Sequence, residues 1–425
     1  MRHASSHTIL PQYIPRSTSL DGRFGRIFGK LPPWVPPGID DADRATNIGN
    51  FVTANMSLPQ PEPPPTNENI PAGYTYFGQF VDHDITFDPT SSLTRQNDPE
   101  GLQNFRSPRL DLDSIYGRGP DDQPYLYQRD AVDSAGNPIK GLLLTGAGIN
   151  GKEFDLPRIR PDKAVVDKAI AEGKDAPAVA LIGDPRNDEN IIVSQFQLTF
   201  LRLHNRLLRK LTEQDLAAGS LRTSDERFQE AQRIVRWFYQ YVVWNDFVRR
   251  LVPRTIWETA LKLSSTGTGL ELGLKDIYNW RVNPFIPVEF SVAAYRLGHS
   301  LIRSGYQLNF PKQRAANHPD GPVGAHHELP IFDPAVSGKP DLHGGRLLPD
   351  KHTIEWDWYF SMDAPSPPFP QLSNLLDIKI SSSVANIPGS NRPLATLNHP
   401  ARVAPRIAVR HRCRARDGVR ADRAR

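Results

Sequence analysis

Cysteine is nearly absent from this chain of 425 residues: the single one is Cys413, close to the C-terminal end. The rest of the chain therefore forms no internal disulfide and no thiolate metal site. No stretch of about 18 apolar residues occurs, so we expect no membrane span. The first residues also lack the apolar core of a secretory signal peptide. These absences leave two locations open: the cytoplasm, or export without such a signal.

A basic surface for nucleic acid is missing as well. The formal net charge is +4, but residues 402–425 contain nine Arg and two Asp and so contribute +7. The remainder has 42 basic residues (51 less 9) against 45 acidic ones (47 less 2), a balance of −3. Because basic and aromatic residues do not interleave there, we expect no nucleic-acid partner.

Proline, in contrast, is abundant. The 40 prolines are about twice the usual share of roughly 5 %, and proline interrupts helices and central strands. Residues 1–70 therefore read as an irregular arm with a proline-rich end. Apolar residues at helical spacing predict helices over residues 74–86, 189–211, 224–252 and 288–304. We expect a mainly α protein with long proline-rich connections and few short strands.

The first predicted helix places charged residues inside an aromatic, apolar segment, "YFGQFVDHDI". Gln79 and His83 are four residues apart and share one helical face, with Asp82 beside them. Asp84 points about 100° away from His83. One helix could therefore serve two sites. Taken alone, the same pattern also fits an acidic pair in the N-terminal turn beside a hydrogen-bonded histidine.

Oxygen ligands gather in residues 106–119. Ser107, Arg109, Asp111 and Asp113 alternate along a segment that we expect to be extended, which places them on one side. Two carboxylates, a hydroxyl and a backbone carbonyl suit calcium, which takes about six to eight oxygen ligands. The segment has no Cys or His, which argues against zinc. The alternative is a solvated strand face.

Further candidates lie in the later helices. Arg186 precedes the second predicted helix and Glu189 falls in its first turn; an arginine there is ordinarily a surface ion-pair residue. His204, in the middle of that helix, reads as a core histidine with satisfied hydrogen bonds. His299, in the fourth predicted helix, follows Gly298, which would let a flat or bulky group approach closely. One such histidine alone is more often structural than a ligand.

Taken in order, these segments resemble the animal-type haem peroxidases of the peroxidase–cyclooxygenase superfamily, particularly the bacterial members. The resemblance runs from about residue 70 to 398 and rests on five motifs: "GQFVDHD", "RLDLDSIYG", "GDPRNDEN…LRLHNRL", "VEFSVAAYRLGHS" and "HTIEWDWYF". It implies a peroxidase domain over residues 71–398 with haem b and calcium as cofactors. Hydrogen peroxide would be the oxidant, and a halide or small organic molecule the electron donor.

The resemblance also implies roles for the matched residues. His83 would be the distal acid–base residue, with Gln79 near it, and Arg186 the distal arginine. His299 would be the axial iron ligand. Calcium would be held by Asp84, Ser107, the Arg109 carbonyl, Asp111 and Asp113. Further haem-binding residues would be Asp82 and Glu189, which match carboxylates that become ester-linked to haem in many relatives, Arg296 in the proximal motif, and Asn398 as partner of the proximal histidine.

The resemblance ends after Asn398. The tail at 399–425 is rich in Arg, Ala and Val, as expected when GC-rich DNA is read out of frame, and it replaces a Gly-Leu-Pro-Ser-Gly-like segment of the family. One permitted reverse translation, shifted by one base, restores that segment. We therefore expect a peroxidase domain that a frameshift has truncated.

Two other functions remain open. One is a fatty-acid dioxygenase of the same superfamily, whose proximal motif is Tyr-Arg-Trp-His-like; here residues 295–299 read Tyr-Arg-Leu-Gly-His, which favours the peroxidase. The other is a truncated calcium-binding remnant without stable haem and without enzymatic activity.

Overall fold

The structure is a computed structural model, and it describes most of the chain. The described residues are 24–27, isolated positions between 43 and 69, 70–88, 104–147, 154–172, 176–263, 270–273, 278, 284–309, 328–332, 341–362 and 370–385. Asn398 and the tail at 399–425 lie outside them, as does most of the arm at 1–70. Where the arm is described, Gly25 bonds to residues 286 and 288, and Leu58 bonds to residue 380.

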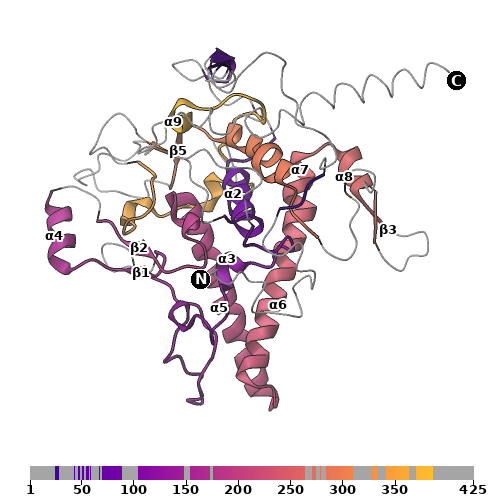
Figure 1. The fold of residues 1–425 in the computed structure, drawn as a ribbon. Helices are drawn as coiled ribbons and strands as arrows, with labels where there is room; N and C mark the ends of the chain where they lie inside the picture. Colours follow the sequence, from indigo (N-terminus) through magenta and orange to yellow (C-terminus); the bar gives the residue numbers. More distant parts are fainter. Residues whose placement is uncertain are drawn as a thin grey trace.

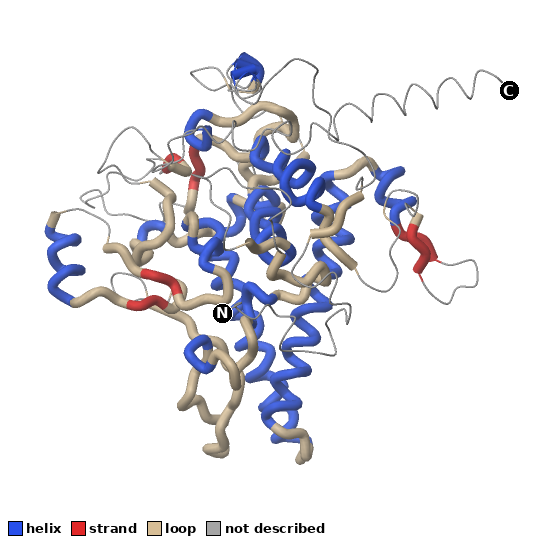
Figure 2. The backbone as a smooth tube through the Cα atoms, viewed as in Figure 1, coloured by secondary structure: helices blue, strands red, loops and turns tan. Residues whose placement is uncertain are grey.

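Helices dominate the described chain, as the sequence predicts (Figure 1). The α-helices are α2 (Gly73–Ile85), α3 (Asp113–Tyr116), α4 (Lys163–Ala171), α5 (Ile191–Ala218), α6 (Ser224–Val242), α7 (Arg249–Leu251), α8 (Arg254–Ala260) and α9 (Ser382–Ala385). The strands are β1 (Arg158–Ile159), β2 (Val179–Ala180), β3 (Leu261–Leu263), β4 (Leu270–Leu272), β5 (Gly305–Gln307) and β6 (Glu328–Pro330). They pair as three antiparallel two-stranded sheets, β1–β2, β3–β4 and β5–β6, outside the helical centre (Figure 2). Among the described residues, no helix is both long and apolar enough to cross a bilayer.

Helix α2 lies at the centre of the core and is buried on nearly every face. All of its residues except Gln79 are buried. Phe80 stacks on Phe200 of α5 with ring centroids 4.9 Å apart, and Phe77 meets Phe247 edge-on at 5.5 Å. Such contacts contribute about 0.5–1.5 kcal/mol beyond the burial of apolar area. They fix the orientation of the helix that carries His83.

Helices α5 and α6 each begin after a capping residue; α6 starts at the predicted residue 224, and α5 starts two residues after the predicted 189. Asn190 accepts a hydrogen bond from the Val193 N–H and caps α5, so Glu189 lies just before this helix rather than in its first turn. Thr223, not Ser224, caps α6 through a reciprocal capping box with Glu226. Helix α5 also runs beyond residue 211, because its chain continues as a good helix former until Gly219 adopts φ 61°.

The fourth predicted helix is irregular. Residues Phe290–Ala294 (η6) form a π-helical segment and Tyr295–Leu301 (η7) form a 3-10 helix. The expectation of one strong α-helix over 288–304 was therefore wrong. Gly298 weakens a regular helix by about 1 kcal/mol, and π segments are frequent at functional sites because they re-aim side chains.

The segment at 106–119 is not extended, contrary to the prediction. Residues 108 and 109 form a turn, and Leu110 and Leu112 have left-handed backbone angles, φ 56° and 59°. Leucine rarely adopts this conformation. At Leu112 this conformation is stabilised because the side chain is fully buried and the backbone N–H donates to Asp84 Oδ2 at 3.2 Å.

Candidate active site

His83 lies near the C-terminal end of α2 and is 4 % exposed. Its Nδ1 is 2.7 Å from Asn187 Oδ1. Burial, and then the positive charge of Arg186, lower the pKa of His83 to about 4. The imidazole is therefore neutral at physiological pH, as a proton acceptor must be. Asn187 was not singled out from the sequence, since a lone Asn in a turn gives no signal.

Gln79 and Glu189 meet on the same side of α2. Gln79 Nε2 donates to Glu189 Oε2 at 3.1 Å, and Asn190 Nδ2 donates to Gln79 Oε1 at 3.0 Å. Glu189 is exposed to solvent. Desolvation by the surrounding protein nevertheless raises its pKa to about 7. Two predicted site residues, Gln79 of α2 and Glu189 before α5, thus meet at the junction of these helices.

Arg186 is held by an ion pair and by backbone carbonyls at the end of α2. Its Nε and Nη2 donate to Asp184 at 3.0 and 2.7 Å, and Nη2 donates to the His83 carbonyl at 3.0 Å and also to the Thr86 carbonyl. Asp184 is fully buried; burial alone would raise its pKa, but Arg186 and Arg106 hold the pKa well below its usual range. Arg186 is therefore a fixed cation beside His83 rather than an ordinary surface residue.

Arg106 strengthens the same corner of the site. Its Nε donates to the His83 carbonyl at 3.2 Å, and its Nη2 lies 2.6 Å from Asp184 Oδ2. The carbonyls of a last helical turn lack partners within the helix and carry partial negative charge, so two guanidinium groups there stabilise α2. This second arginine was not predicted from the sequence.

The segment η6–η7 approaches α2 from another side. Arg296 Nη1 is 3.2 Å from Asp82 Oδ2. Burial would raise the pKa of Asp82, but Arg296, His83, Arg186 and the Thr86 hydroxyl together lower the pKa below its usual value. The structure thus brings two of the predicted haem-binding residues into one ion pair.

His299 lies half-buried at the end of the same segment. Burial, followed by the charge of Arg296, lowers its pKa to about 4, with a smaller contribution from His83. Among the described residues its Nδ1 has no hydrogen-bond partner. The predicted partner, Asn398, lies outside the described residues.

A flat cofactor fits beside His299. A Cβ built on Gly298 meets no described atom within 4 Å, so the protein leaves room next to this histidine. His299 is neutral at physiological pH and can therefore supply a ring nitrogen to a metal. The Asp82 carboxylate and the Arg296 guanidinium lie close by. Such groups would face the polar edge of a flat cofactor.

The predicted calcium residues are arranged less compactly. Among the described residues, no group of three or more His, Cys, Asp or Glu side chains is placed to hold a metal ion. Asp84 Oδ1 and Asp111 Oδ1 are nevertheless buried without a hydrogen-bond partner there. Burial and the charge of Asp111 raise the pKa of Asp84 to about 7. Two buried, mutually repelling carboxylates fit an oxygen-ligated cation, completed by Ser107, Asp113 and backbone carbonyls.

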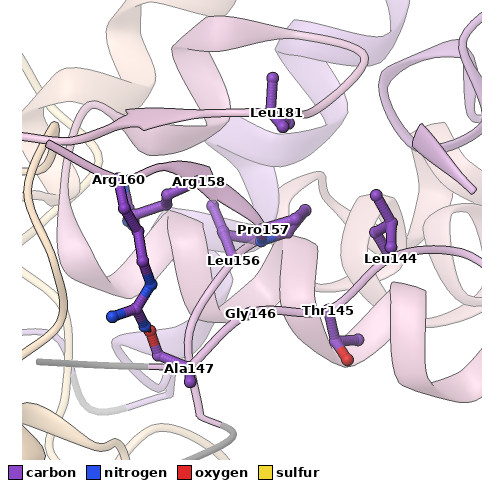
Figure 3. Close-up of a pocket in the computed structure, with 9 residues that line it drawn as sticks. All are labelled: Leu144, Thr145, Gly146, Ala147, Leu156, Pro157, Arg158, Arg160 and Leu181. Carbon is purple, nitrogen blue, oxygen red and sulfur yellow. The ribbon is translucent and has the colours of Figure 1, made fainter. Parts of the chain in front are cut away.

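A separate pocket of about 510 Å³ lies against β1 and contains none of the residues above (Figure 3). Leu156, Pro157 and Leu181 line it together with the 144–147 segment, and Arg160 crosses its side to donate to the Ala147 carbonyl. Arg158 turns its guanidinium away to Asp155 and Asp188. Both arginines of this pocket are therefore engaged within the protein.

The fold has a clear structural neighbour. Peroxidase A from Dictyostelium discoideum matches 94 % of this chain and 75 % of its own, with a TM-score of 0.54 and 14 % sequence identity. This likeness assigns the fold class, that of the mainly α-helical peroxidases. The sequence model described as animal haem peroxidase matches residues 92–330, more than half of the chain. The chain belongs to the animal haem peroxidase family.

Individual relatives are distant. A peroxidase-like protein of Margaritifera margaritifera is 26 % identical over 266 residues, 54 % of this chain and 31 % of that protein. Chorion peroxidase of Drosophila melanogaster is 36 % identical over 128 residues, 30 % of this chain and 14 % of that protein. The chain thus matches about a third or less of the length of these relatives. The family match includes Arg186 and His299 but begins after His83.

Proposed function

We propose that this chain is a haem-dependent peroxidase that reduces hydrogen peroxide and oxidises a halide or a small organic donor. The observation that carries the proposal is His83, a buried neutral imidazole whose Nδ1 is engaged by Asn187, which leaves Nε2 for chemistry. A fixed guanidinium, Arg186, lies beside it. A base next to a cation is the pair that heterolysis of a peroxide bond requires.

The haem would be held by His299 through a ring nitrogen, with Arg296, Asp82, Glu189 and Gln79 around it. When bound, the haem would supply the two-electron redox chemistry that couples peroxide to the donor. Asp82 and Glu189 are our candidates for ester attachment, and Asn398 for the hydrogen-bond partner of His299.

The protein's own residues would manage the protons. Nε2 of His83 accepts a proton from one oxygen of hydrogen peroxide and returns it to the departing oxygen, which leaves as water. The positive charge of Arg186 stabilises negative charge on that oxygen as the O–O bond breaks. Two electrons from the donor and two protons complete the reduction of one peroxide to two water molecules.

Calcium would have a structural role. Asp84, Ser107, the Arg109 carbonyl, Asp111 and Asp113 would hold it, and it would neutralise the buried carboxylates of Asp84 and Asp111. Because Asp84 adjoins His83 on α2, this cation would fix the orientation of the catalytic helix.

An absorption spectrum tests the proposal. The 425-residue chain is loaded with haem and recorded before and after hydrogen peroxide, and then with an electron donor. A sharp Soret band that shifts with peroxide and returns with the donor is expected. Free-haem absorption without donor oxidation rejects the proposal, and oxygen uptake with linoleate in place of peroxide turnover indicates a dioxygenase instead.

A further inference from the structure

Three buried side-chain and backbone groups form a hydrogen-bonded chain that ends on His83. Gln197 Nε2 donates to the Ser114 carbonyl at 3.0 Å, and Asn187 Nδ2 donates to Gln197 Oε1 at 2.8 Å. Asn187 Oδ1 lies 2.7 Å from His83 Nδ1. Ser114, Asn187 and Gln197 are fully buried, so water does not substitute for any of these contacts.

The chain has only one consistent direction. A carbonyl oxygen can only accept, so the Gln197 amide must present its NH₂ group to Ser114. Its oxygen then faces Asn187, which must present its own NH₂ group in turn. The Asn187 oxygen is left facing His83, and an oxygen at hydrogen-bond distance requires a proton on Nδ1. Any reversed amide would place two oxygens about 3 Å apart in a buried site, where lost hydrogen bonds are most unfavourable.

We propose that Asn187 and Gln197 are positioning residues that hold His83 in the tautomer protonated at Nδ1, with the lone pair on Nε2. This inference rests on the proposed peroxidase function, because it assigns Nε2 as the base that receives the peroxide proton. Free imidazole favours the opposite tautomer, whose Nε2 carries a hydrogen and cannot accept. We call the hydrogen-bonded chain from the Ser114 carbonyl through Gln197 and Asn187 the relay. It reverses that preference because its first acceptor is fixed in the backbone of α3.

The relay joins parts of the chain that are distant in sequence. Ser114 belongs to α3, Asn187 to the 3-10 turn before α5 (Pro185–Asp188, η4), Gln197 to α5 and His83 to α2. It therefore also fixes the ring plane of His83 relative to three separate elements. Truncating either amide removes this constraint without touching Arg186 or His299.

The test uses two readouts on the 425-residue chain. Histidine-selective ¹⁵N spectra of the haem-free protein at about pH 8, above the range in which imidazole ordinarily titrates, report the tautomer, and His83→Gln identifies the His83 signal among the twelve histidines. We expect Nδ1–H in the parent chain. We expect a mixture, or Nε2–H, in Asn187→Leu and Gln197→Leu.

Activity of the haem-loaded chain is the second readout. Asn187→Leu should slow the reaction with peroxide about 10²-fold, within the range of lost acid–base catalysis. Asn205→Leu is the matched control. The Asn205 side-chain amide also makes two hydrogen bonds, accepting from the Leu143 N–H and donating to the Leu143 carbonyl, but it does not contact His83. It should leave the tautomer and the rate unchanged.

Different results reject the relay and the proposed peroxidase function. An Nε2–H signal for His83 in the parent chain overturns the relay, whatever the activity. The relay is also overturned if Asn187→Leu retains both the Nδ1–H signal and the parent rate. A parent chain that shows Nδ1–H but no reaction with peroxide rejects the proposed function and leaves the relay standing. If both Leu variants unfold, seen as collapsed dispersion of the other histidine signals, the parent spectrum decides.

Discussion

His83 and Asp84 are adjacent in the sequence but serve different sides of helix α2. His83 Nδ1 lies 2.7 Å from Asn187, in the turn before α5, while Asp84 Oδ2 accepts the Leu112 N–H at 3.2 Å, in the loop before α3. Consecutive helical residues point about 100° apart, so a single helix can present a base to one site and a carboxylate to another. The proposed catalytic and calcium sites therefore share one rigid element.

Replacing His83 tests its role as acid–base catalyst. His83→Ala should lower the rate of the reaction with hydrogen peroxide by about 10²- to 10⁴-fold, while haem remains bound because His299 is intact. Stopped-flow absorption of the haem-loaded variant measures both properties. His204→Gln, a substitution far from this chemistry, is the control, and a normal rate in His83→Ala would remove His83 from the mechanism.

Calcium should stabilise the folded chain. A cation between Asp84 and Asp111 relieves their repulsion, and ligand at 100 times its dissociation constant contributes about 2.7 kcal/mol. Thermal unfolding with added calcium, and again after a chelator, measures the shift of the midpoint. Asp111→Asn should abolish the shift, whereas Asp121→Asn, an exposed carboxylate paired with Lys140, should retain it. A midpoint indifferent to calcium in the parent chain refutes the site.

Arg158 anchors the turn that carries Arg186 and Glu189. Its side chain is 3 % exposed, and it donates to Asp155 at 2.9 Å and to Asp188 at 2.6 and 2.8 Å. Arg158→Met leaves two buried carboxylates without their cation and should lower the free energy of unfolding by about 3–5 kcal/mol.

Urea unfolding measures this loss, and Arg160→Met supplies the comparison. Arg160 lies two residues away on the exposed side, so its replacement should change the free energy of unfolding by less than about 1 kcal/mol. Equal effects of the two substitutions would contradict a special role for the Arg158 ion pairs.

Stability should fall in mild acid because buried histidines resist protonation. His204 is fully buried against Tyr116 and the Gly141 carbonyl, which confirms it as a hydrogen-bonded core histidine, and burial lowers its pKa from 6.5 to about 4. Between these values the unfolded chain binds a proton that the folded chain does not, so stability decreases as pH falls. This one group contributes on the order of 3 kcal/mol.

The pH dependence of urea unfolding checks this. The lowered pKa values of His83, His204 and His299 should make the free energy of unfolding of the parent chain decline from about pH 6.5 towards pH 4. The raised pKa values of Asp84 and Glu189 oppose part of this decline. His204→Gln should show a shallower decline, since His83 and His299 keep the same lowered pKa. An unchanged slope would show that His204 is protonated without penalty in the folded state.

Much of the site was readable from local pattern. The spacing of Gln79, His83 and Asp84 predicted the helix and the separation of its two faces, and the structure places α2 within one residue of the expected ends. Capping positions were harder to locate. Thr223 and Ser224 are both good capping residues, and only the reciprocal bonds with Glu226 distinguish them.

Errors arose where tertiary contacts override local preference. Alternating polar residues at 107–113 suggested a strand, but burial of Leu112 and its bond to Asp84 hold the backbone in a left-handed turn. The apolar spacing of 288–304 suggested a regular helix, but this segment packs against α2 as consecutive π and 3-10 turns around Gly298. Neither outcome is encoded in the residues of the segment alone.

The sequence by itself determined the mainly helical class, the central apolar helix and the identity of the chemical groups, because periodicity and residue type are local properties. The tertiary structure alone decided their states. His83 meets Asn187, which lies 104 positions later in the chain, and Asp82 meets Arg296 through the approach of η7 to α2. Protonation, tautomer and charge depend on burial and on neighbours within a few ångströms, and those neighbours exist only once distant segments have packed together.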